Sequence, residues 1–331
     1  MKNILTSLEE KKLRLDSYRP LPGELITNLS EWFKIELTYT SNAIEGNTLS
    51  RAETALVIDK GLTVSGKTLQ EHQEAINHAQ AFDWVTEQAK TTGRSSLTES
   101  TILDLHQRIL HKIDDRNAGR YRTVPVRIYG STVIMPNPLK VKELMTQFLS
   151  WLHQTHDHPL QIALDAHLKL VSVHPFVDGN GRTARLLMNL LLMQAGYPPA
   201  IVLPAERKEY VASIEKVQLG GSPADYHALM YRSIDRSLDI YLDSLEDEKQ
   251  QQVLTKKNLL KIGQLARLSS QTVPTIRHWT KEGLLSVEGY TQGHYQLYSP
   301  TQLPLIKKIK KLQDKDRLTI AEIKRHIQTT S

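Results

Sequence analysis

One stretch of twelve residues, HPFVDGNGRTAR from His174 to Arg185, combines side chains suited to the chemistry of phosphate esters. His174 has a pKa in the range that general-base catalysis needs near neutral pH. Asp178 offers the hard oxygen ligands with which proteins hold Mg²⁺ beside nucleotide phosphates. A lone histidine or a lone Gly-Asn-Gly turn usually serves the fold, but folding alone does not account for this combination.

The loop that follows His174 is predicted to bring the backbone close to a ligand. Pro175 disfavours helix at the residue before it, so we expect His174 at a break between a helix and a loop. Gly179 and Gly181 lack a Cβ, which allows a ligand to approach the backbone. A helix is expected to start near Arg182, where unpaired N–H groups and the helix dipole favour a phosphate.

Two arginines lie in the first turn of that expected helix. Arg182 and Arg185 are three residues apart, so both project from one face. Positive side chains oppose the helix dipole at this end, which makes them poor choices for stability alone. They are well suited to clamp a polyphosphate.

The same segment matches the signature of the Fic family, H-x-F-x-(D/E)-G-N-G-R-x-x-R, at every fixed position. GRYRTVPVRI, LMTQFLSWL and NLLLMQAGYPP also resemble Fic proteins, so the resemblance covers roughly residues 25–245. It implies a mainly helical fold with a small β-hairpin flap. It also implies transfer of AMP from ATP to a Ser, Thr or Tyr hydroxyl of a target protein or of the chain itself. Doc-type relatives phosphorylate and have Lys at the position of Gly181, which argues against kinase-like chemistry.

The resemblance also assigns roles to individual residues. His174 would deprotonate the target hydroxyl, and Asp178 would hold Mg²⁺, with ATP as co-substrate. The ATP phosphates would be bound by Asn180 with the backbone of Gly179 and Gly181, and by Arg182 and Arg185. Because phosphoryl-type transfer needs little covalent help from a protein, positioning and charge neutralisation would dominate catalysis.

The stretch VPVRIYGSTVIMP interrupts the helical periodicity. It is rich in β-branched residues around Gly130, which predicts a short hairpin. By resemblance, Thr132, Val133 and Ile134 would pair with the extended backbone of a target, as an added edge strand does. Tyr210 lies where the family often places an aromatic residue near the adenine.

A second motif, SNAIEGN from Ser41 to Asn47, lies upstream of the first. Ser41 is expected to cap the start of a short helix and Gly46 to end it, which would leave Glu45 on the surface. The helix dipole disfavours a carboxylate at that end, so Glu45 would be better placed beside an arginine. The motif resembles the inhibitory motif of Fic proteins, (S/T)-x-x-x-E-(G/N). That resemblance implies that Glu45 pairs with Arg185 and occupies the site of the γ-phosphate.

The positive charge of the chain is concentrated at its C-terminal end. The net charge is +6, and the segment from residue 251 onward has 14 basic and 5 acidic residues, whereas the first 250 residues have a small negative excess. Such a distribution is typical of a nucleic-acid-binding appendage on a near-neutral body. A solvated basic helix is the alternative on charge alone.

Residues 258–331 resemble the DNA-binding domain of MerR-type regulators. KIGQLARLSSQTVPTIRHWTKEGLL predicts two helices joined by a turn, and a wing with YQLYS and two basic helices follow. By analogy, the helix at Val273–Lys281 would enter the major groove of double-stranded DNA, where Arg277 and Lys281 would meet phosphates or bases. Gln296 stands where MerR wings usually have Arg, and no long dimerisation helix follows. A protein-docking role is therefore the alternative, and firm DNA binding would need a homodimer formed by the Fic part.

Four regions are expected along the chain. They are an N-terminal helical region at 1–95 with the motif at 41–47, a catalytic domain at 96–245, a polar linker at 246–257 and a winged helix-turn-helix domain at 258–331. The chain has no Cys, which excludes disulfides and thiolate metal sites. No apolar run reaches about 18 residues and the N-terminus has no signal-peptide pattern, so we expect a cytoplasmic protein without a membrane segment.

The other conspicuous histidines are expected to serve the fold, and two other functions remain compatible with the sequence. His153, His156 and His158 cluster before Pro159, but no carboxylates converge on them, so a solvated loop is the simpler interpretation. His167 is interpreted as a core or capping residue. Two alternatives to AMP transfer stay open. One is a transcription regulator whose Fic part senses nucleotide or modifies only itself, and the other is an enzyme that removes AMP.

Overall fold

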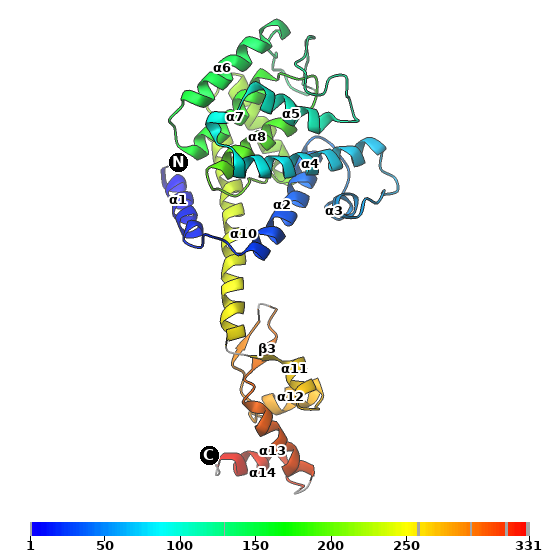
Figure 1. The fold of residues 1–331 in the computed structure, drawn as a ribbon, viewed down its shortest axis with the longest axis vertical. Coiled ribbons are helices and arrows are strands. Elements are labelled where there is room, and N and C mark those ends of the chain that lie inside the picture. The colour runs from blue at the N-terminus through cyan, green and yellow to red at the C-terminus, as the bar shows by residue number, and fades with distance from the viewer. Residues whose placement is uncertain (1, 129, 257–258, 292, 315–316, 329–331) are drawn as a thin grey trace. The chain divides into compact units, whose positions relative to one another are not determined.

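The protein, described here from a computed structural model, divides into two compact units, residues 1–242 (unit 1) and residues 243–331 (unit 2). Figure 1 shows both as largely helical. The structure describes residues 2–128, 130–256, 259–291, 293–314 and 317–328.

Unit 1 is built from helices joined by loops and three short 3₁₀ turns. The helices are α1 (Lys2–Asp16), α2 (Gly23–Ile44), α3 (Arg51–Lys60), α4 (Leu69–Thr91), α5 (Glu99–Leu110), α6 (Val141–Gln154), α7 (Pro159–Val173), α8 (Asn180–Gln194), α9 (Arg207–Gln218) and the first part of α10 (Ala224–Lys256), which continues into unit 2. The 3₁₀ turns are Arg94–Ser96, Pro138–Lys140 and Pro204–Glu206. The prediction of a mainly helical fold is confirmed.

Helix α8 lies at the centre of unit 1. It packs against α7, α4, α5 and α2 (Figure 1). Most of its residues are buried, including Leu186, Leu187, Met188 and Leu190. A helix that is apolar on nearly every side is expected in the middle of a bundle. Its packing on several neighbours fixes the position of its first turn, where the conspicuous motif lies.

The prediction of a β-hairpin around Gly130 is wrong for the described part of 121–136, which contains no strand and follows an irregular path. The alternation expected of a strand is present, because Val133 and Met135 are buried whereas Ile134 is 78% exposed. Glu215 of α9 accepts hydrogen bonds from the Ser131 hydroxyl (2.7 Å) and the Thr132 N–H (3.1 Å). Two strands alone are marginally stable, and here contacts with α9 hold the segment instead.

Unit 2 has the predicted helix-turn-helix, wing and two further helices. Its elements are β1 (Leu260–Lys261), α11 (Ile262–Leu268), α12 (Val273–Lys281), β2 (Gly289–Tyr290), β3 (Gln296–Tyr298), α13 (Gln302–Asp314) and α14 (Ile320–Gln328). The strands form an antiparallel sheet in the order β1-β3-β2, with Leu260 opposite Tyr298 and Tyr290 opposite Gln296. Leu265, Ile276, Trp279, Tyr298 and Ile306 are at the centre of its own hydrophobic core.

The segment predicted as a linker, residues 246–257, is helical as far as Lys256, because α10 crosses the boundary between the units. Polar composition suggested a linker, but a long helix is equally compatible with the Glu-, Lys- and Gln-rich sequence. Within the described ranges, no helix combines the length and the apolar character that a membrane span requires.

Candidate active site

The loop between α7 and α8 is closed by contacts within itself. His174 ends α7 in the left-handed region, at φ 49° and ψ 58°. The Asn180 side chain accepts a hydrogen bond from the Phe176 N–H (2.9 Å) and donates one to the Phe176 carbonyl (3.0 Å). The Asn180 side chain therefore shapes the loop, and its backbone N–H is the group at the helix start that fits the phosphate role predicted for it.

His106 of α5 packs against this loop and holds it in place. This residue was not identified from the sequence. Its ring stacks on Phe176 with 3.6 Å between centroids. Nδ1 accepts from the Gly119 N–H (3.0 Å), so Nε2 must donate to the Asp178 carbonyl (3.0 Å). Burial lowers the pKa of His106 to about 4, which keeps this neutral tautomer at pH 7. Gly179 has φ 74°, and a Cβ there would lie 3.3 Å from the His106 ring.

Helix α8 begins at Asn180, two residues before the predicted start. The first N–H that finds a helical acceptor is that of Thr183, which bonds to the Gly179 carbonyl (2.9 Å). The N–H groups of residues 180–182 precede it and have no acceptor within the helix. Together with the positive end of the helix dipole, they make an anion-binding site.

His174 lies beside this anion site as a neutral base. Its Nδ1 is 3.3 Å from the Val171 carbonyl, an arrangement that places the proton on Nδ1 and leaves Nε2 as the acceptor. Burial lowers the pKa of His174 and outweighs the hydrogen bond to the Val171 carbonyl, which raises it; the Arg122 guanidinium lowers the pKa further, and Glu45 and Asp178 raise it slightly. The imidazole is therefore unprotonated at neutral pH and can accept a proton.

Arg122 joins the loop to the flap and was also missed by sequence reasoning. It is buried, and its Nε donates to the His174 carbonyl (2.7 Å) while Nη2 donates to the Pro136 carbonyl (2.7 Å). Its backbone N–H donates to the Pro175 carbonyl (2.9 Å). One guanidinium therefore fixes both the residue that precedes the motif loop and the end of the flap.

The predicted contact between Glu45 and Arg185 is present. Arg185 Nη2 donates to Glu45 Oε1 (2.7 Å) and to the Ser41 carbonyl (2.9 Å), and its Nε donates to the Ser41 hydroxyl (2.9 Å). The prediction of Ser41 as a helix N-cap is wrong, because Ser41 lies in the last turn of α2, whose apolar periodicity continues to Ile44. Gly46 has φ 103° and ends that helix as predicted.

Glu45 lies directly over the start of α8. A Cβ added at Gly181 would overlap its Oε1. Burial raises the pKa of Glu45, but Arg185, followed by Arg182 and Arg207, outweighs burial, so the net pKa is lowered. The carboxylate is thus an anion at neutral pH, with its side chain still 39% exposed to solvent. The anion-binding site of α8 is occupied by a carboxylate of the chain itself.

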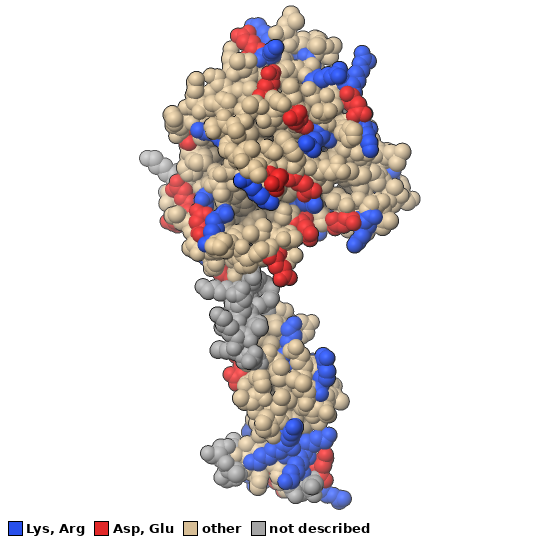
Figure 2. All heavy atoms as spheres, viewed as in Figure 1, with Lys and Arg blue, Asp and Glu red and all other residues tan. Residues whose placement is uncertain are grey.

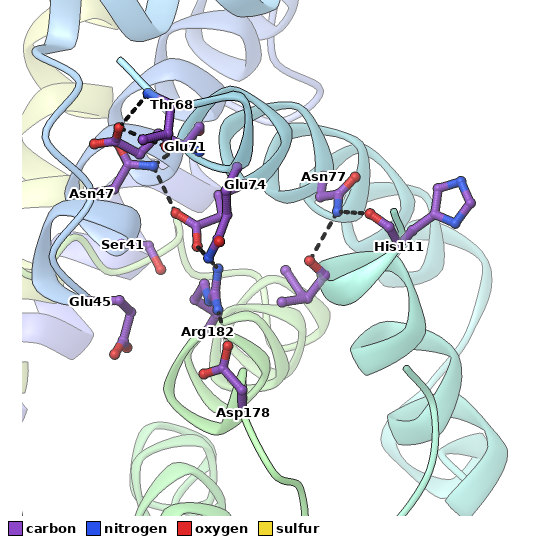
Figure 3. Close-up of polar contacts among 12 residues, drawn as sticks. Ser41, Glu45, Asn47, Thr68, Glu71, Glu74, Asn77, His111, Asp178 and Arg182 are labelled. Atoms are coloured by element: carbon purple, nitrogen blue, oxygen red, sulfur yellow. Dashed lines mark hydrogen bonds and ion pairs between the residues drawn. The ribbon is translucent and has the colours of Figure 1, made fainter. Parts of the chain in front are cut away.

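Arg182 is held between two carboxylates, one on each side (Figure 3). Its Nη2 is 3.2 Å from Asp178 Oδ2 and its Nη1 is 3.4 Å from Glu74 Oε1. The Arg182 side chain is only 4% exposed, and neither Nε nor Nη1 finds a hydrogen-bond acceptor in the described structure, so Glu74 faces Nη1 as an ion pair without a hydrogen bond. Buried donors without a partner are uncommon, and an incoming phosphate would supply hydrogen-bond acceptors to the Arg182 guanidinium.

Asp178 has the exposure and the chemistry that a Mg²⁺ ligand needs. Its side chain is 62% exposed, and its carboxylate oxygens are hard ligands. No group of three or more metal-binding side chains occurs among the residues that the structure describes. A single carboxylate fits Mg²⁺, which commonly takes one or two carboxylates together with substrate phosphates and water.

Tyr210 and His167 lie behind Arg185 in the core. Tyr210 is buried, and its hydroxyl is 2.7 Å from His167 Nε2, so its ring offers no open face to an adenine in this structure. The Tyr226 hydroxyl is 2.9 Å from the opposite nitrogen of His167. His167 is fully buried, which confirms its interpretation as a core residue, and this burial lowers its pKa to about 3.

Two of the clustered histidines, His153 and His158, have separate partners. His153 Nε2 is 2.8 Å from the Leu97 carbonyl. His158 accepts from the Leu160 N–H (3.3 Å) at the start of α7, and its other nitrogen is 3.0 Å from a carboxylate oxygen of Glu9. These contacts anchor loops and helix ends.

The residues predicted to bind DNA lie on the outer face of α12. Ile276 and Trp279 are buried in the core of unit 2, whereas Arg277 and Lys281 are exposed. Figure 2 shows further Lys and Arg side chains gathered on unit 2 over α13. Helix α12 is therefore amphipathic, and Arg277 and Lys281 lie on its exposed face.

Comparisons with known proteins agree with both halves of this description. Residues 96–192 match the model of the Fic/DOC family, and residues 260–330 match that of the MerR HTH family regulatory proteins. The chain is 34% identical to the protein adenylyltransferase Fic of Drosophila grimshawi over 269 residues, which cover 80% of this chain and 54% of that protein. It thus spans about half the length of the curated relatives it matches.

Solved structures show the same fold. A fragment of Fic-1 from C. elegans is 30% identical, with a TM-score of 0.67, and the match covers 75% of this chain and 73% of the fragment. A Fic-domain signaling protein from Bacteroides thetaiotaomicron is 26% identical, with a TM-score of 0.65, over 73% of this chain and 97% of that protein. These matches show what the chain resembles in sequence and in fold.

Proposed function

Because the chain belongs to the Fic/DOC family, we propose that it is a protein adenylyltransferase, which transfers AMP from ATP to a Ser, Thr or Tyr hydroxyl of a protein. The observation that carries this proposal is the anion site of α8 beside the neutral base His174. Phosphate binding and proton acceptance are the two tasks that AMP transfer sets, and both occur at one helix start.

His174 Nε2 takes the proton of the target hydroxyl as the oxygen attacks the α-phosphorus of ATP. The bond from that phosphorus to the bridging oxygen breaks, and pyrophosphate leaves. The N–H groups at the start of α8 face the phosphates, and Arg182 and Arg185 bind their outer oxygens. Once the Glu45 carboxylate is displaced from Arg185, these groups stabilise the negative charge of the phosphates, which is a large contribution that a protein makes to such a transfer.

Mg²⁺ is proposed as the cofactor, held by Asp178 together with the phosphates of ATP. When bound, it neutralises charge on the phosphates and leaving group. The flap residues Thr132 to Ile134 are proposed to receive the target backbone. Among the described residues of this segment, no strand of the chain itself pairs with them, but the N–H groups of Thr132 and Val133 bond to the side chains of Glu215 and Ser131, which a target backbone would have to replace.

Glu45 is proposed to inhibit the enzyme. Its carboxylate neutralises Arg185 and lies over Gly181, where phosphate oxygens of ATP would come within hydrogen-bonding distance. Two anions cannot share this place without strong repulsion. ATP would therefore bind weakly, or in a position that keeps its α-phosphate away from the target hydroxyl.

Intact-protein mass spectrometry after incubation with ATP and Mg²⁺ tests this proposal. Glu45→Gly is expected to acquire AMP, or to label lysate proteins, about ten- to a hundredfold more than wild type, since a charge-assisted contact of ~1–3 kcal/mol is removed. His174→Ala in the same background is the control and should lose ~10²–10⁴-fold in rate. A folded Glu45→Gly protein that gains neither AMP nor labelling activity would contradict the proposal.

DNA binding by unit 2 is a second candidate function. The match to MerR HTH proteins and the exposed Arg277 and Lys281 on α12 favour it. Phosphate contacts from the basic residues would supply affinity, and side chains of α12 would contact base edges. The two functions lie in separate units, so neither excludes the other.

A further inference from the structure

Glu74 is a partly buried carboxylate in α4 whose side chain contacts Arg182 and Asn47 (Figure 3) and also accepts a hydrogen bond from Gln70 Nε2 (3.2 Å). Its Oε1 is 3.4 Å from Arg182 Nη1, and its Oε2 accepts a hydrogen bond from Asn47 Nδ2 (2.9 Å). The Glu74 side chain is 14% exposed. It therefore connects the first turn of α8 to the turn that follows Glu45.

The two carboxylates beside Arg182 differ in how firmly they are held. Asp178 is 62% exposed and is the proposed cation ligand, whereas Glu74 is enclosed and fastened by Asn47. When Asp178 turns toward a cation, the buried Arg182 guanidinium keeps Glu74 as its remaining partner. Burying a cation without a partner is costly, so Glu74 is what allows Arg182 to stay in place.

We propose that Glu74 is a positioning residue, which holds Arg182 at the start of α8 and leaves Asp178 available to a divalent cation. This inference rests on the proposed function, because it presumes that ATP binds at α8. Without the Glu74 charge, Arg182 would have Asp178 as its only carboxylate among the contacts described, and it would compete with the cation for that side chain.

The Glu74 carboxylate also holds the turn that follows Glu45. Asn47, two residues after Glu45, donates from Nδ2 to Glu74 Oε2 and to the Glu71 carbonyl (3.0 Å). Its Oδ1 accepts from the Leu49 N–H (3.0 Å). Glu74 therefore contacts Arg182 directly and, through Asn47, also holds the turn that places Glu45 over α8.

Glu71, one turn earlier on α4, provides a matched control. Its Oε1 accepts from the N–H (2.8 Å) and hydroxyl (2.6 Å) of Thr48, and its Oε2 accepts from the Thr68 N–H (2.8 Å). These bonds lower the pKa of Glu71 to about 2. Glu71 thus anchors the same turn as Glu74, but no contact with Arg182 is found for it in the described structure.

The test measures ATP binding by calorimetry in a Glu45→Gly/His174→Ala background, which removes both the inhibitory carboxylate and turnover. Adding Glu74→Gln is expected to raise the Kd for ATP with Mg²⁺ about tenfold, the worth of one charge-assisted contact. The Mg²⁺ concentration that half-saturates binding should rise as well, because Arg182 then competes for Asp178. Adding Glu71→Gln should leave both values within about twofold.

Glu74→Asp keeps the charge but withdraws it by one methylene, so its Kd should lie between those of the background and Glu74→Gln. Equal effects of Glu74→Gln and Glu71→Gln, or no effect of either, would reduce Glu74 to an anchor of the turn and overturn the inference. If Glu74→Gln does not fold, an Asp variant that binds ATP and Mg²⁺ like the background overturns it. Failure of Glu45→Gly to transfer AMP would refute the proposed function, and the binding comparison would still decide the role of Glu74.

Discussion

His174 is fixed on both sides by contacts that use its backbone and one ring nitrogen. Its carbonyl accepts from Arg122, and its Nδ1 lies against the Val171 carbonyl, so Nε2 is left to the substrate. This arrangement sets the tautomer as well as the position of the base. The proton-accepting form is therefore present before the substrate arrives.

The pH dependence of AMP transfer should report this histidine. Burial and Arg122 lower its pKa below the ordinary value, so the neutral, active form persists to lower pH than an exposed histidine would allow. In the Glu45→Gly variant, kcat/KM should stay level from pH 8 downward and fall only below about 6.5. A rate profile measured from pH 5 to pH 8 checks this, and a midpoint above that of a free histidine would contradict it.

At the residue scale, the sequence predicted the groups that contact substrate but not those that support them. The twelve-residue motif holds its base, cation ligand and arginines at fixed spacing, so their roles could be inferred together. His106, Arg122 and Glu74 come from separate segments and reach the loop only through the fold. The inward turn of the Asn180 side chain was equally invisible, because either a ligand or the loop could satisfy an amide.

At the element scale, one long helix replaces the short helix predicted around the second motif. Ser41 and Asn42 resemble a cap because polar residues interrupt the apolar pattern, yet both are buried in the last turn of α2. The polar side chain of Ser41 serves there as the acceptor of a hydrogen bond from Arg185 Nε, and it does not begin a helix. The C-terminal end of α2 thus places Glu45 at the start of α8. The C-terminus of α2 and the N-terminus of α8 together form the site.

Arg185→Ala should separate an inhibitory ion pair from a structural one. Glu45→Gly and Arg185→Ala break the same 2.7 Å contact, so a purely structural pair predicts similar consequences for both. We expect AMP transfer to rise only in Glu45→Gly, because Arg185→Ala removes the phosphate clamp together with the block. Labelling with isotopic ATP compares the two, and thermal unfolding controls for stability. A comparable gain in both variants would remove Arg185 from ATP binding.

At the scale of the whole chain, the positions of the helices could be predicted from the sequence, but the conformation of the flap could not. Apolar periodicity gave the helices of unit 1, and in unit 2 the predicted bounds of α12 coincide with the observed ones. The β-branched stretch around Gly130 predicted a hairpin, but β-propensity reports fit to a half-buried surface rather than pairing. That surface is supplied here by contacts such as those with Glu215, which no local pattern reveals.

DNA binding, if it is a property of this chain, should belong to residues 252–331 and depend steeply on salt. That segment contains the positive excess, and it has its own hydrophobic core around Trp279. Each phosphate neutralised should add about −0.9 to the slope of log affinity against log salt. Mobility shifts of duplex DNA by this fragment and by the full chain measure the slope, and Arg277→Ala/Lys281→Ala should flatten it by up to about two contacts. A folded fragment that shifts no duplex even at low salt would favour a protein-docking surface on α12 instead.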